Sequence, residues 1–211
     1  GTQNSESVLH AETVHKERLR VQKLQQEMLL LNEQLMVQSQ HDALTGLPNR
    51  AYLNNYAEET LSKALKNQVN FGIEILDIDF FKSVNDTYGH MEGDHYLTAV
   101  ADLLSRITEE YSNVFAARYG GDEFVLVYYD KSVDEIKEIM NQLKLSTVNV
   151  KLPAMSQLGE DHVTLSQGCC NRIPEPLNRL WDYLARADTV LYDVKKKGKN
   201  HYKVSERFKK A

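Results

Sequence analysis

The sequence lacks most of the features that mark secreted, membrane-spanning or nucleic-acid-binding proteins. Its 211 residues include only two cysteines, Cys169 and Cys170, which are adjacent and too few for a disulfide framework or a zinc site. No apolar run approaches the roughly 20 residues that cross a bilayer, and no signal peptide opens the chain. The net charge of −5 argues against a general nucleic-acid binder. We therefore expect a soluble, cytoplasmic protein with reduced cysteines and neither a membrane nor a nucleic acid as partner.

The composition suits one globular domain with an appendage. Charged residues make up 26% of the chain and hydrophobic residues 42%, and there is no internal repeat or low-complexity tract. Residues 1–7 are polar and begin without Met, so we interpret them as disordered, as an expression remnant or as the start of an excised fragment. On the last interpretation, we expect a sensor domain upstream of this sequence. Residues 206–211 are set apart as a C-terminal tail.

Residues 8–40 contain neither Gly nor Pro and repeat apolar side chains every seven residues. The seam positions are occupied by Val14, Val21, Met28, Leu35, Leu24 and Leu31. This rhythm predicts a parallel coiled coil that joins two chains into a homodimer. The alternative is a single amphipathic helix folded back on the domain, because Leu29 and Leu30 widen the apolar stripe. Gly46 and Pro48 then break the helix, so the domain begins near His41.

From residue 41 onward, helix and strand patterns alternate. We expect helices over 50–66, from 91 or 94 to 107, over 132–145, and from 177 to Gly198, with loop chemistry in 82–94. Strands are expected within 71–81, 114–119, 124–129, 162–170 and 202–204. The predicted class is α/β or α+β, with helices flanking a central sheet to which the pair 114–119 and 124–129 adds an antiparallel hairpin.

Two carboxylates end an otherwise apolar strand face. By the two-residue period, Asp77 and Asp79 share a face with Phe71, Ile73 and Ile75. Burying unpaired carboxylates costs several kcal/mol, so this pattern favours a bound cation. The alternative is that both acids lie past the sheet edge in solvent.

Two more acids occupy the hairpin turn. Asp122 and Glu123 follow Gly120 and Gly121, and the turn needs the positive φ angles that glycine adopts without strain. Taken alone, these acids could be ordinary exposed turn residues.

Four segments together resemble the GGDEF diguanylate cyclase family. They are DALTGLPNR (42–50), LDIDFFKSVNDTYGHMEGD (76–94), RYGGDEF (118–124) and KKKGKN (195–200), in the family's order and spacing. The resemblance covers residues 41–205. It implies a five-stranded sheet covered by helices, like the palm of polymerases and adenylyl cyclases. It also implies GTP as substrate, Mg²⁺ (or Mn²⁺) as cofactor and the joining of two GTP molecules into cyclic di-GMP.

The resemblance assigns metal ligands to Asp77, Asp122 and the backbone carbonyl of Ile78. Phosphoryl transfer concentrates negative charge, which divalent ions on acidic side chains neutralise, and Mg²⁺ accepts few protein oxygens. Gly120 and Gly121 lack side chains and let nucleotide phosphates approach the backbone.

The family's catalytic positions match Glu123 and Lys82. Glu123 matches the proposed base for the 3′-hydroxyl, although an ordinary Glu is a weak base, so the alternative is a turn or supporting carboxylate. Lys82 matches a contact to phosphate and transition state, against the alternative of a solvated surface lysine. Asp79 also matches the motif and is interpreted as an accessory acid only.

The substrate positions implied by the family are Asn85, His90, Asp94, Lys195 and Lys199. A carboxylate at 94 can accept from the N1–H and N2–H₂ edge of guanine, which adenine lacks, so Asp94 with Asn85 favours GTP. His90 matches a substrate contact, with loop packing as the alternative. Lys195 and Lys199 match positions that hold the terminal phosphates, and Lys stands at 199 where Arg is usual, which weakens GTP binding without abolishing it.

One departure concerns regulation. Members of the family often carry Arg-x-x-Asp upstream of the signature, whereas residues 111–114 here read Tyr-Ser-Asn-Val. We therefore expect the primary product-inhibition site to be absent.

The sequence predicts a diguanylate cyclase that dimerises through its N-terminal helix, and two other functions are alternatives to it. A catalytically silent GTP or cyclic di-GMP sensor would be favoured by broken signature positions, and none is visible. The other alternative is a purely structural coiled-coil protein, but that role does not explain why acids occupy positions 77, 94 and 122.

Overall fold

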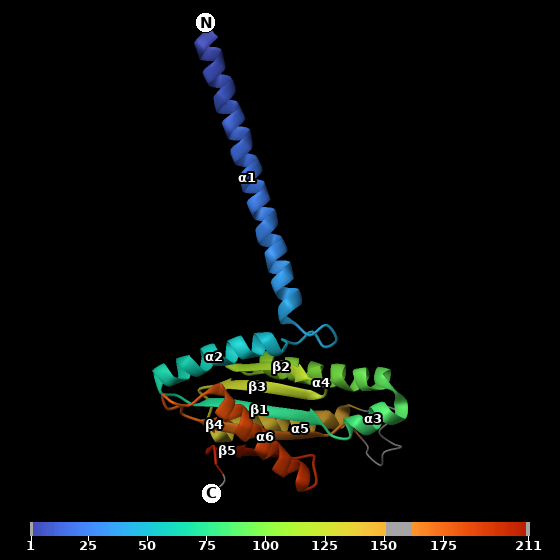
Figure 1. The fold of residues 1–211 in the computed structure, drawn as a ribbon. Coiled ribbons are helices and arrows are strands. Elements are labelled where there is room, and N and C mark those ends of the chain that lie inside the picture. The colour runs from blue at the N-terminus through green and yellow to red at the C-terminus, as the bar shows by residue number, and fades with distance from the viewer. Residues whose placement is uncertain (1, 151–161, 210–211) are drawn as a thin grey trace. The chain divides into compact units, whose positions relative to one another are not determined.

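The computed structural model describes residues 2–150 and 162–209, and the chain divides into two units, Gly1–Gln40 and His41–Ala211. The elements in chain order are α1 (Thr2–Gln40), α2 (Arg50–Asn67), β1 (Phe71–Ile78), α3 (Phe81–Tyr88), α4 (His90–Glu110), β2 (Val114–Gly120), β3 (Glu123–Tyr129), α5 (Val133–Ser146), the 3₁₀ turn η1 (Thr147–Asn149), β4 (Leu165–Arg172), α6 (Leu180–Lys196) and β5 (Tyr202–Ser205) (Figure 1).

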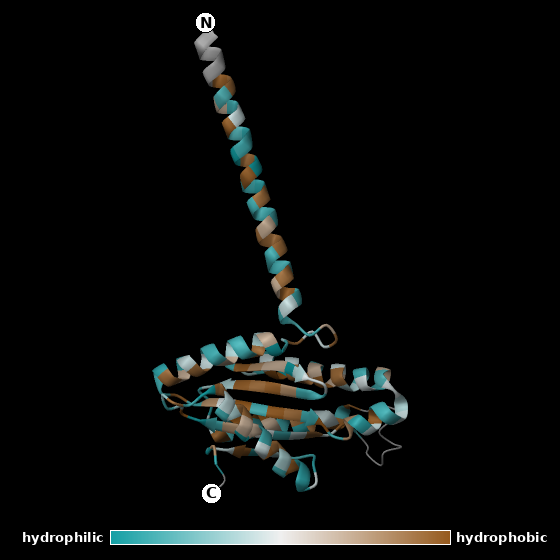
Figure 2. Ribbon diagram, viewed as in Figure 1, coloured by the Kyte–Doolittle hydropathy of each residue, from teal (hydrophilic) through white to brown (hydrophobic). Residues whose placement is uncertain are grey.

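The first unit is the single helix α1, of 39 residues. It begins at Thr2, so residues that the sequence analysis set apart before residue 8 continue the helix. Apolar side chains recur between polar ones along its length (Figure 2). The seam residues of the predicted coiled coil are all exposed in the single chain, for example Leu24 and Leu31, each 55% exposed. No helix within residues 2–150 and 162–209 is long and apolar enough to span a membrane.

The second unit is built on one five-stranded sheet with the order β2-β3-β1-β4-β5. All neighbouring pairs are antiparallel except β4 and β5, which run parallel. The predicted hairpin forms from β2 and β3. The predicted class, a five-stranded sheet flanked by helices, is confirmed.

Helices cover both faces of the sheet, because its strands are apolar on both sides (Figures 1 and 2). On one face, α2 and α6 pack on the β1 residues Phe71, Ile73 and Ile75. On the other, α4 and α5 pack on Leu76 and Ile78. Asp77 therefore belongs to the α2 and α6 face by the two-residue alternation of β1.

Several helix starts follow directly from capping side chains. The Asn49 side chain accepts a hydrogen bond from the Tyr52 N–H at 3.0 Å and begins α2. Ser132 and Glu135 form a reciprocal capping box at the start of α5, with bonds of 3.1 and 2.7 Å. Such caps satisfy backbone donors that a helix end leaves open.

The prediction of a loop from residue 82 up to the helix start at 91 or 94 was wrong. Residues 81–88 form α3 and α4 begins at His90, so only the junction at Gly89 is irregular. The Asn, Asp and Gly composition suggested turns. Burial of Val84 against α4 stabilises the short helix instead, and Gly89, with φ of 87°, ends it.

The segment after β5 packs on the domain as far as residue 209. The Phe208 ring lies edge-on to Tyr183 at 4.9 Å, and the Arg172 guanidinium lies over it at 4.5 Å. Arg186 donates to the Arg207 carbonyl at 2.8 Å. Residues 206–209 are therefore part of the domain and not the separate tail that the sequence suggested.

Both cysteines are buried in β4 and neither forms a disulfide, as predicted. Their side chains alternate, with Cys169 in the core beneath α4 and α5 and Cys170 in the core beneath α2 and α6. Neighbours on opposite faces of a strand cannot pair.

Gly168→Ala is expected to destabilise the domain by about 1–3 kcal/mol, because overpacking forces the backbone apart. A Cβ at this position would lie 2.3 Å from the Leu191 nitrogen and 2.7 Å from the Ala187 carbonyl oxygen, both in the backbone of α6. The measurement is urea unfolding, with Gly72→Ala as the matched control. The nearest obstacle there is the side-chain oxygen of Asn171 at 2.8 Å, which can move. Equal losses in the two variants would contradict the close approach of α6.

Glu74 leads to a prediction of pH-dependent stability. It is fully buried, and burial raises its pKa from 4.5 to about 8 although the Tyr128 hydroxyl donates to it at 2.5 Å. Since the unfolded chain ionises first, this group's contribution to stability is complete below pH 4.5 and falls as the pH rises toward 8.

Glu74→Gln removes that titration. The free energy of unfolding of the variant, relative to the natural chain, should be higher at pH 8 than at pH 5 by roughly 2–4 kcal/mol. Denaturant unfolding at both pH values measures this difference. A difference that stays constant between the two pH values would show that Glu74 is ionised in the fold.

Candidate functional site

The turn between β2 and β3 carries the glycines and acids of the RYGGDEF segment. Gly120 ends β2 and Glu123 begins β3. Gly121 has φ of 55°, a left-handed conformation that a Cβ disfavours. A Cβ added at either glycine would meet no atom within 4 Å, so the backbone of the turn is open on that side.

Arg118 holds this turn in place. Its Nε and Nη2 donate to the Gly121 carbonyl at 3.2 and 2.9 Å, and its Nη1 donates to Asp42 at 3.1 Å. Asp42 also accepts from the N–H and hydroxyl of Thr45 at 2.9 and 2.8 Å. Burial acts against ionisation, but these bonds hold the pKa of Asp42 below its ordinary value. The sequence analysis quoted both segments and missed this link between them.

Two acids face each other across β1 and β3. Asp77 and Glu123 are direct cross-strand partners, and Asp122 precedes Glu123 in the turn. Asp77 is 5% exposed; its Oδ2 forms an ion pair with Lys195 of α6, while its Oδ1 is buried without a hydrogen-bond partner. Burial raises the pKa of Asp77 to about 6, against the effect of Lys195. Asp77 lies within the sheet, so the alternative of a solvent-exposed strand end is wrong for this residue.

Glu123 is half-buried, and its pKa is raised. Burial is the largest cause, and the negative charges of Asp122 and Asp188 add to it, while Lys195 and Arg50 oppose it. A raised pKa makes a carboxylate a stronger base. Asp188 and Arg50 influence this site although the sequence analysis gave them no role; both stand on helices that cover the same sheet face, α6 and α2.

Asp79 has a structural role. It is 3% exposed and accepts from the hydroxyls of Ser166 and Thr164 at 2.7 and 2.8 Å and from the Asn200 N–H at 3.0 Å. Both carboxylate oxygens are therefore occupied. Asp79 fastens the turn after α6 to the end of β1, which is more specific than the accessory acid predicted.

The predicted guanine-binding residues lie at the corner of α3 and α4. Asn85 packs so tightly against Gly93 that a Cβ there would lie 1.9 Å from the Asn85 Oδ1. This oxygen is buried without a partner, and the neighbouring Asp94 is exposed. Both are hydrogen-bond acceptors, as a guanine edge requires. Lys82 and His90 are also exposed on these helices.

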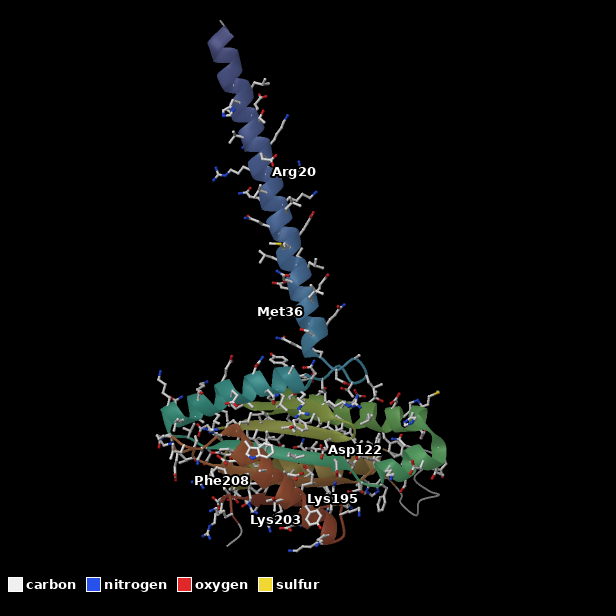
Figure 3. All side chains as sticks on the ribbon, viewed as in Figure 1. Arg20, Met36, Asp122, Lys195, Lys203 and Phe208 are labelled. Atoms are coloured by element: carbon white, nitrogen blue, oxygen red, sulfur yellow. The ribbon has the colours of Figure 1, made fainter. Side chains whose placement is uncertain are left out.

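The two lysines assigned to phosphate stand in the last turn of α6 and in the turn after it. Lys195 lies near Asp122 as well as Asp77, and Figure 3 shows Lys195 and Asp122 in the same region. Lys199 lies in the turn after α6, with its Nζ 5.4 Å from the centre of the Phe80 ring. Its backbone has φ of 63°, and the Asp79–Asn200 bond fixes the next residue.

The residues predicted to bind metal offer oxygen donors only. Within residues 2–150 and 162–209, no three acidic, His or Cys side chains are grouped to hold a metal by themselves. The predicted ligand set has only two side chains, those of Asp77 and Asp122, together with the Ile78 carbonyl. Mg²⁺ fills the rest of its coordination shell with water and phosphate oxygens at such sites. The buried, unpartnered Oδ1 of Asp77 fits an oxygen ligand for this ion.

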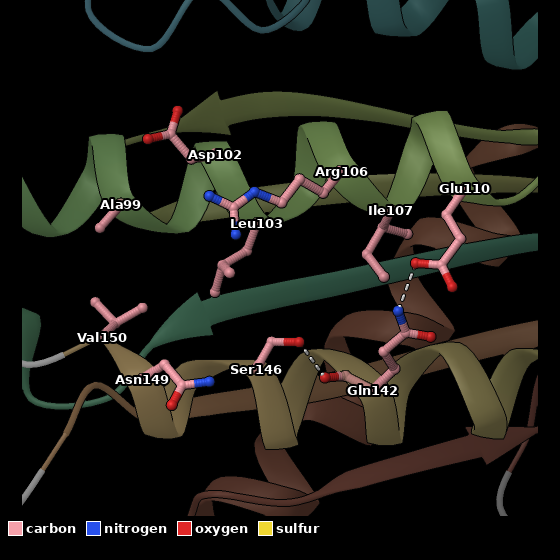
Figure 4. A pocket seen from close by; sticks show the side chains of 10 residues that line it. All are labelled: Ala99, Asp102, Leu103, Arg106, Ile107, Glu110, Gln142, Ser146, Asn149 and Val150. Atoms are coloured by element: carbon pink, nitrogen blue, oxygen red, sulfur yellow. Dashed lines mark hydrogen bonds between the residues drawn. The ribbon is translucent and has the colours of Figure 1, made fainter.

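A groove of about 450 Å³ lies between α4 and α5, on the sheet face opposite the acids (Figure 4). None of the predicted site residues lines it. Beside it, the Tyr111 hydroxyl donates to Gln142, which donates to Glu110 at 2.6 Å. Residues 111–114, where the Arg-x-x-Asp motif is missing, thus join α4 to β2 near this groove.

Comparison with known proteins covers most of the chain. Residues 39–201 match the diguanylate cyclase GGDEF domain. The diguanylate cyclase DgcZ of Escherichia coli is 33% identical over 167 residues, which are 79% of this chain and 53% of DgcZ. The cyclic di-GMP phosphodiesterase PdeR of the same organism is 32% identical over 170 residues, 81% of this chain and 24% of PdeR. The chain thus spans about half the length of such relatives, or less.

Among solved structures, the chain is similar to the coiled coil and GGDEF domain of DgcB from Caulobacter crescentus in complex with c-di-GMP. The TM-score is 0.74 at 29% sequence identity, with 95% of this chain and 98% of the DgcB chain covered.

Proposed function

Because this chain belongs to the diguanylate cyclase GGDEF domain family, we propose that it joins two GTP molecules into cyclic di-GMP and two pyrophosphates. The observation that carries the proposal is the gathering of Asp77, Asp122 and Glu123 beside Lys195 at one end of the sheet. Three acids and a lysine next to an open glycine turn suit the transfer of a phosphoryl group.

The chemistry assigned to Glu123 is proton transfer. The 3′-oxygen of one GTP attacks the α-phosphorus of the other, the bond from that phosphorus to the pyrophosphate oxygen breaks, and the 3′-hydroxyl proton passes to Glu123. A second, equivalent step closes the ring. The raised pKa of Glu123 brings it closer to the pH at which it must accept this proton.

The other residues hold and orient the substrate. Asn85 and Asp94 accept from the guanine edge, and His90 stands beside them. The triphosphate lies over Gly120 and Gly121, with Lys82, Lys195 and Lys199 supplying positive charge. Asp77 and Asp122, with the Ile78 carbonyl, would hold Mg²⁺ or Mn²⁺, and that ion would supply positive charge against the transferred phosphate and the leaving pyrophosphate.

The reaction also requires two copies of the chain. Each domain has one set of these residues, while the product has two equivalent links, so two sites must face each other about a two-fold axis. The exposed heptad seam of α1 is the surface that joins the two chains.

The decisive experiment incubates the purified chain with GTP and Mg²⁺ and identifies the product by mass and by its digestion with phosphodiesterase. We expect cyclic di-GMP and pyrophosphate, and no corresponding product from ATP. A product of a different mass would overturn the proposed reaction.

A second candidate is a silent module that binds GTP or cyclic di-GMP. One relative, PdeR, is named as a phosphodiesterase, so similarity to the family does not by itself indicate synthesis. Calorimetric binding of either nucleotide, without turnover in Mg²⁺ or Mn²⁺, would favour this candidate. If the chain neither binds these nucleotides nor turns GTP over, both candidate functions are excluded.

A further inference from the structure

Lys195 occupies a central position among the acids of the site. Its ammonium forms an ion pair with Asp77, and it interacts electrostatically with Asp122 and Glu123. The Asp77 carboxylate in this pair is only 7% exposed, whereas the lysine side chain is 37% exposed. Although burial acts against its charge, the bond to Asp77 and the three acids raise the pKa of Lys195. A single positive charge thus neutralises part of a three-acid cluster.

A divalent ion on Asp77 would meet this ammonium at close range. Two like charges held at close range repel each other, and a double charge repels more strongly than a single one. The carboxylate of Asp77 therefore favours one cation over two. Lys195 can release Asp77, because a lysine ammonium is carried on a flexible side chain that can rotate from one acceptor to another.

The same ammonium has a second acceptor in the proposed function. The triphosphate would lie over the glycine turn next to Asp122, within the group of charges that Lys195 already faces. Moving from a carboxylate to a phosphate keeps the lysine paired, so its transfer leaves no buried charge without a partner.

We infer that Lys195 is an exchangeable counterion, which neutralises Asp77 until a divalent ion takes that carboxylate and the ammonium moves to the nucleotide phosphates. The competition between Lys195 and the metal rests on the ion pair and on the proposed binding of metal by Asp77. The transfer to phosphate rests on the proposed function. Metal and nucleotide should then each strengthen the other's binding, since the coupling of two ligands is reciprocal.

The first measurement is a titration of the full chain with Mn²⁺ in the absence of nucleotide. The electron paramagnetic resonance signal of the free ion reports how much Mn²⁺ is bound. We expect Lys195→Met to bind Mn²⁺ at least ten-fold more tightly than the natural chain. The matched control is Lys196→Met, because Lys196 is exposed on the same helix and lies over the Tyr192 ring at 5.0 Å. It should leave Mn²⁺ affinity unchanged.

The second measurement repeats the titration with a non-hydrolysable GTP analogue. The analogue should raise Mn²⁺ affinity strongly in the natural chain and in Lys196→Met, and several-fold less in Lys195→Met, where the exchange has already been removed. Thermal unfolding checks that each variant is folded. If Lys195→Met does not fold, Lys195→Gln removes the charge while keeping a hydrogen-bond donor for Asp77.

Equal or weaker Mn²⁺ binding by the Lys195 variant without nucleotide would overturn the inference, because Lys195 would then support the metal ligands. This outcome is independent of turnover. A chain that makes no cyclic di-GMP but shows tighter Mn²⁺ binding on loss of Lys195 refutes the proposed reaction and keeps the competition between Lys195 and the metal for Asp77.

Discussion

Replacing Asp122 with Asn is expected to lower turnover of GTP by at least about 100-fold, because it removes one of the two carboxylates that we propose as metal ligands. Replacing Glu123 with Gln should lower it by about 10²–10⁴-fold, the usual contribution of a general base. Both side chains are only partly buried at a turn, so neither substitution should lower the melting temperature appreciably. Initial rates at saturating GTP and thermal unfolding measure the two quantities.

The two variants should differ in their response to metal. Raising the Mn²⁺ concentration should recover part of the activity of Asp122→Asn, whose defect is weakened metal binding, and none of that of Glu123→Gln. Asp130→Asn is the matched control, because it removes an exposed carboxylate after the opposite end of β3 that has no proposed contact with metal or substrate. Near-normal turnover by either turn variant at saturating Mg²⁺ would remove its residue from the mechanism.

Joint substitution of Leu24 and Leu31 by Glu is expected to convert the protein to a monomer and to make specific activity depend on concentration. Both side chains stand at exposed seam positions of α1, and charges facing each other across a coiled coil are strongly unfavourable. Joining two chains through this helix raises the effective concentration of the second site to about the millimolar range. Sedimentation velocity and activity over a dilution series test both effects.

The control adds the same charges outside the seam, as Gln22→Glu and Gln26→Glu on α1. These should leave both the sedimentation coefficient and the specific activity of the dimer unchanged. A seam variant that sediments as a monomer yet keeps full specific activity on dilution would show that α1 does not bring the sites together.

Local sequence patterns predicted most of the elements around the site. The β2–β3 hairpin was predicted from two apolar runs around Gly120 and Gly121, and α5 from a periodic run after Ser132. The failure at α3 comes from tertiary packing, since the burial of one residue, Val84, outweighs a composition typical of turns. A short window of sequence does not show which side chains pack against another element.

The arrangement of charges was beyond what spacing could predict. The facing of Asp77 and Glu123 depends on the register between β1 and β3, and the Asp79–Asn200 bond joins residues 121 positions apart. The resemblance placed Lys195 near phosphate, but its ion pair with Asp77 depends on how closely α6 packs at Gly168. Sequence spacing does not predict how closely a helix packs on a strand.

Arg118 links the first residues of the domain to the turn between β2 and β3. The first residues after the end of α1 include Asp42, and a single guanidinium bonds Asp42 on one side and the Gly121 carbonyl on the other. Pulling the entrance away from the turn must break hydrogen bonds to a charged group, each worth about 1.5–3 kcal/mol. A twist or pull delivered at residue 41 therefore reaches the turn that carries Asp122 through only two side-chain contacts, without passing through the hydrophobic core.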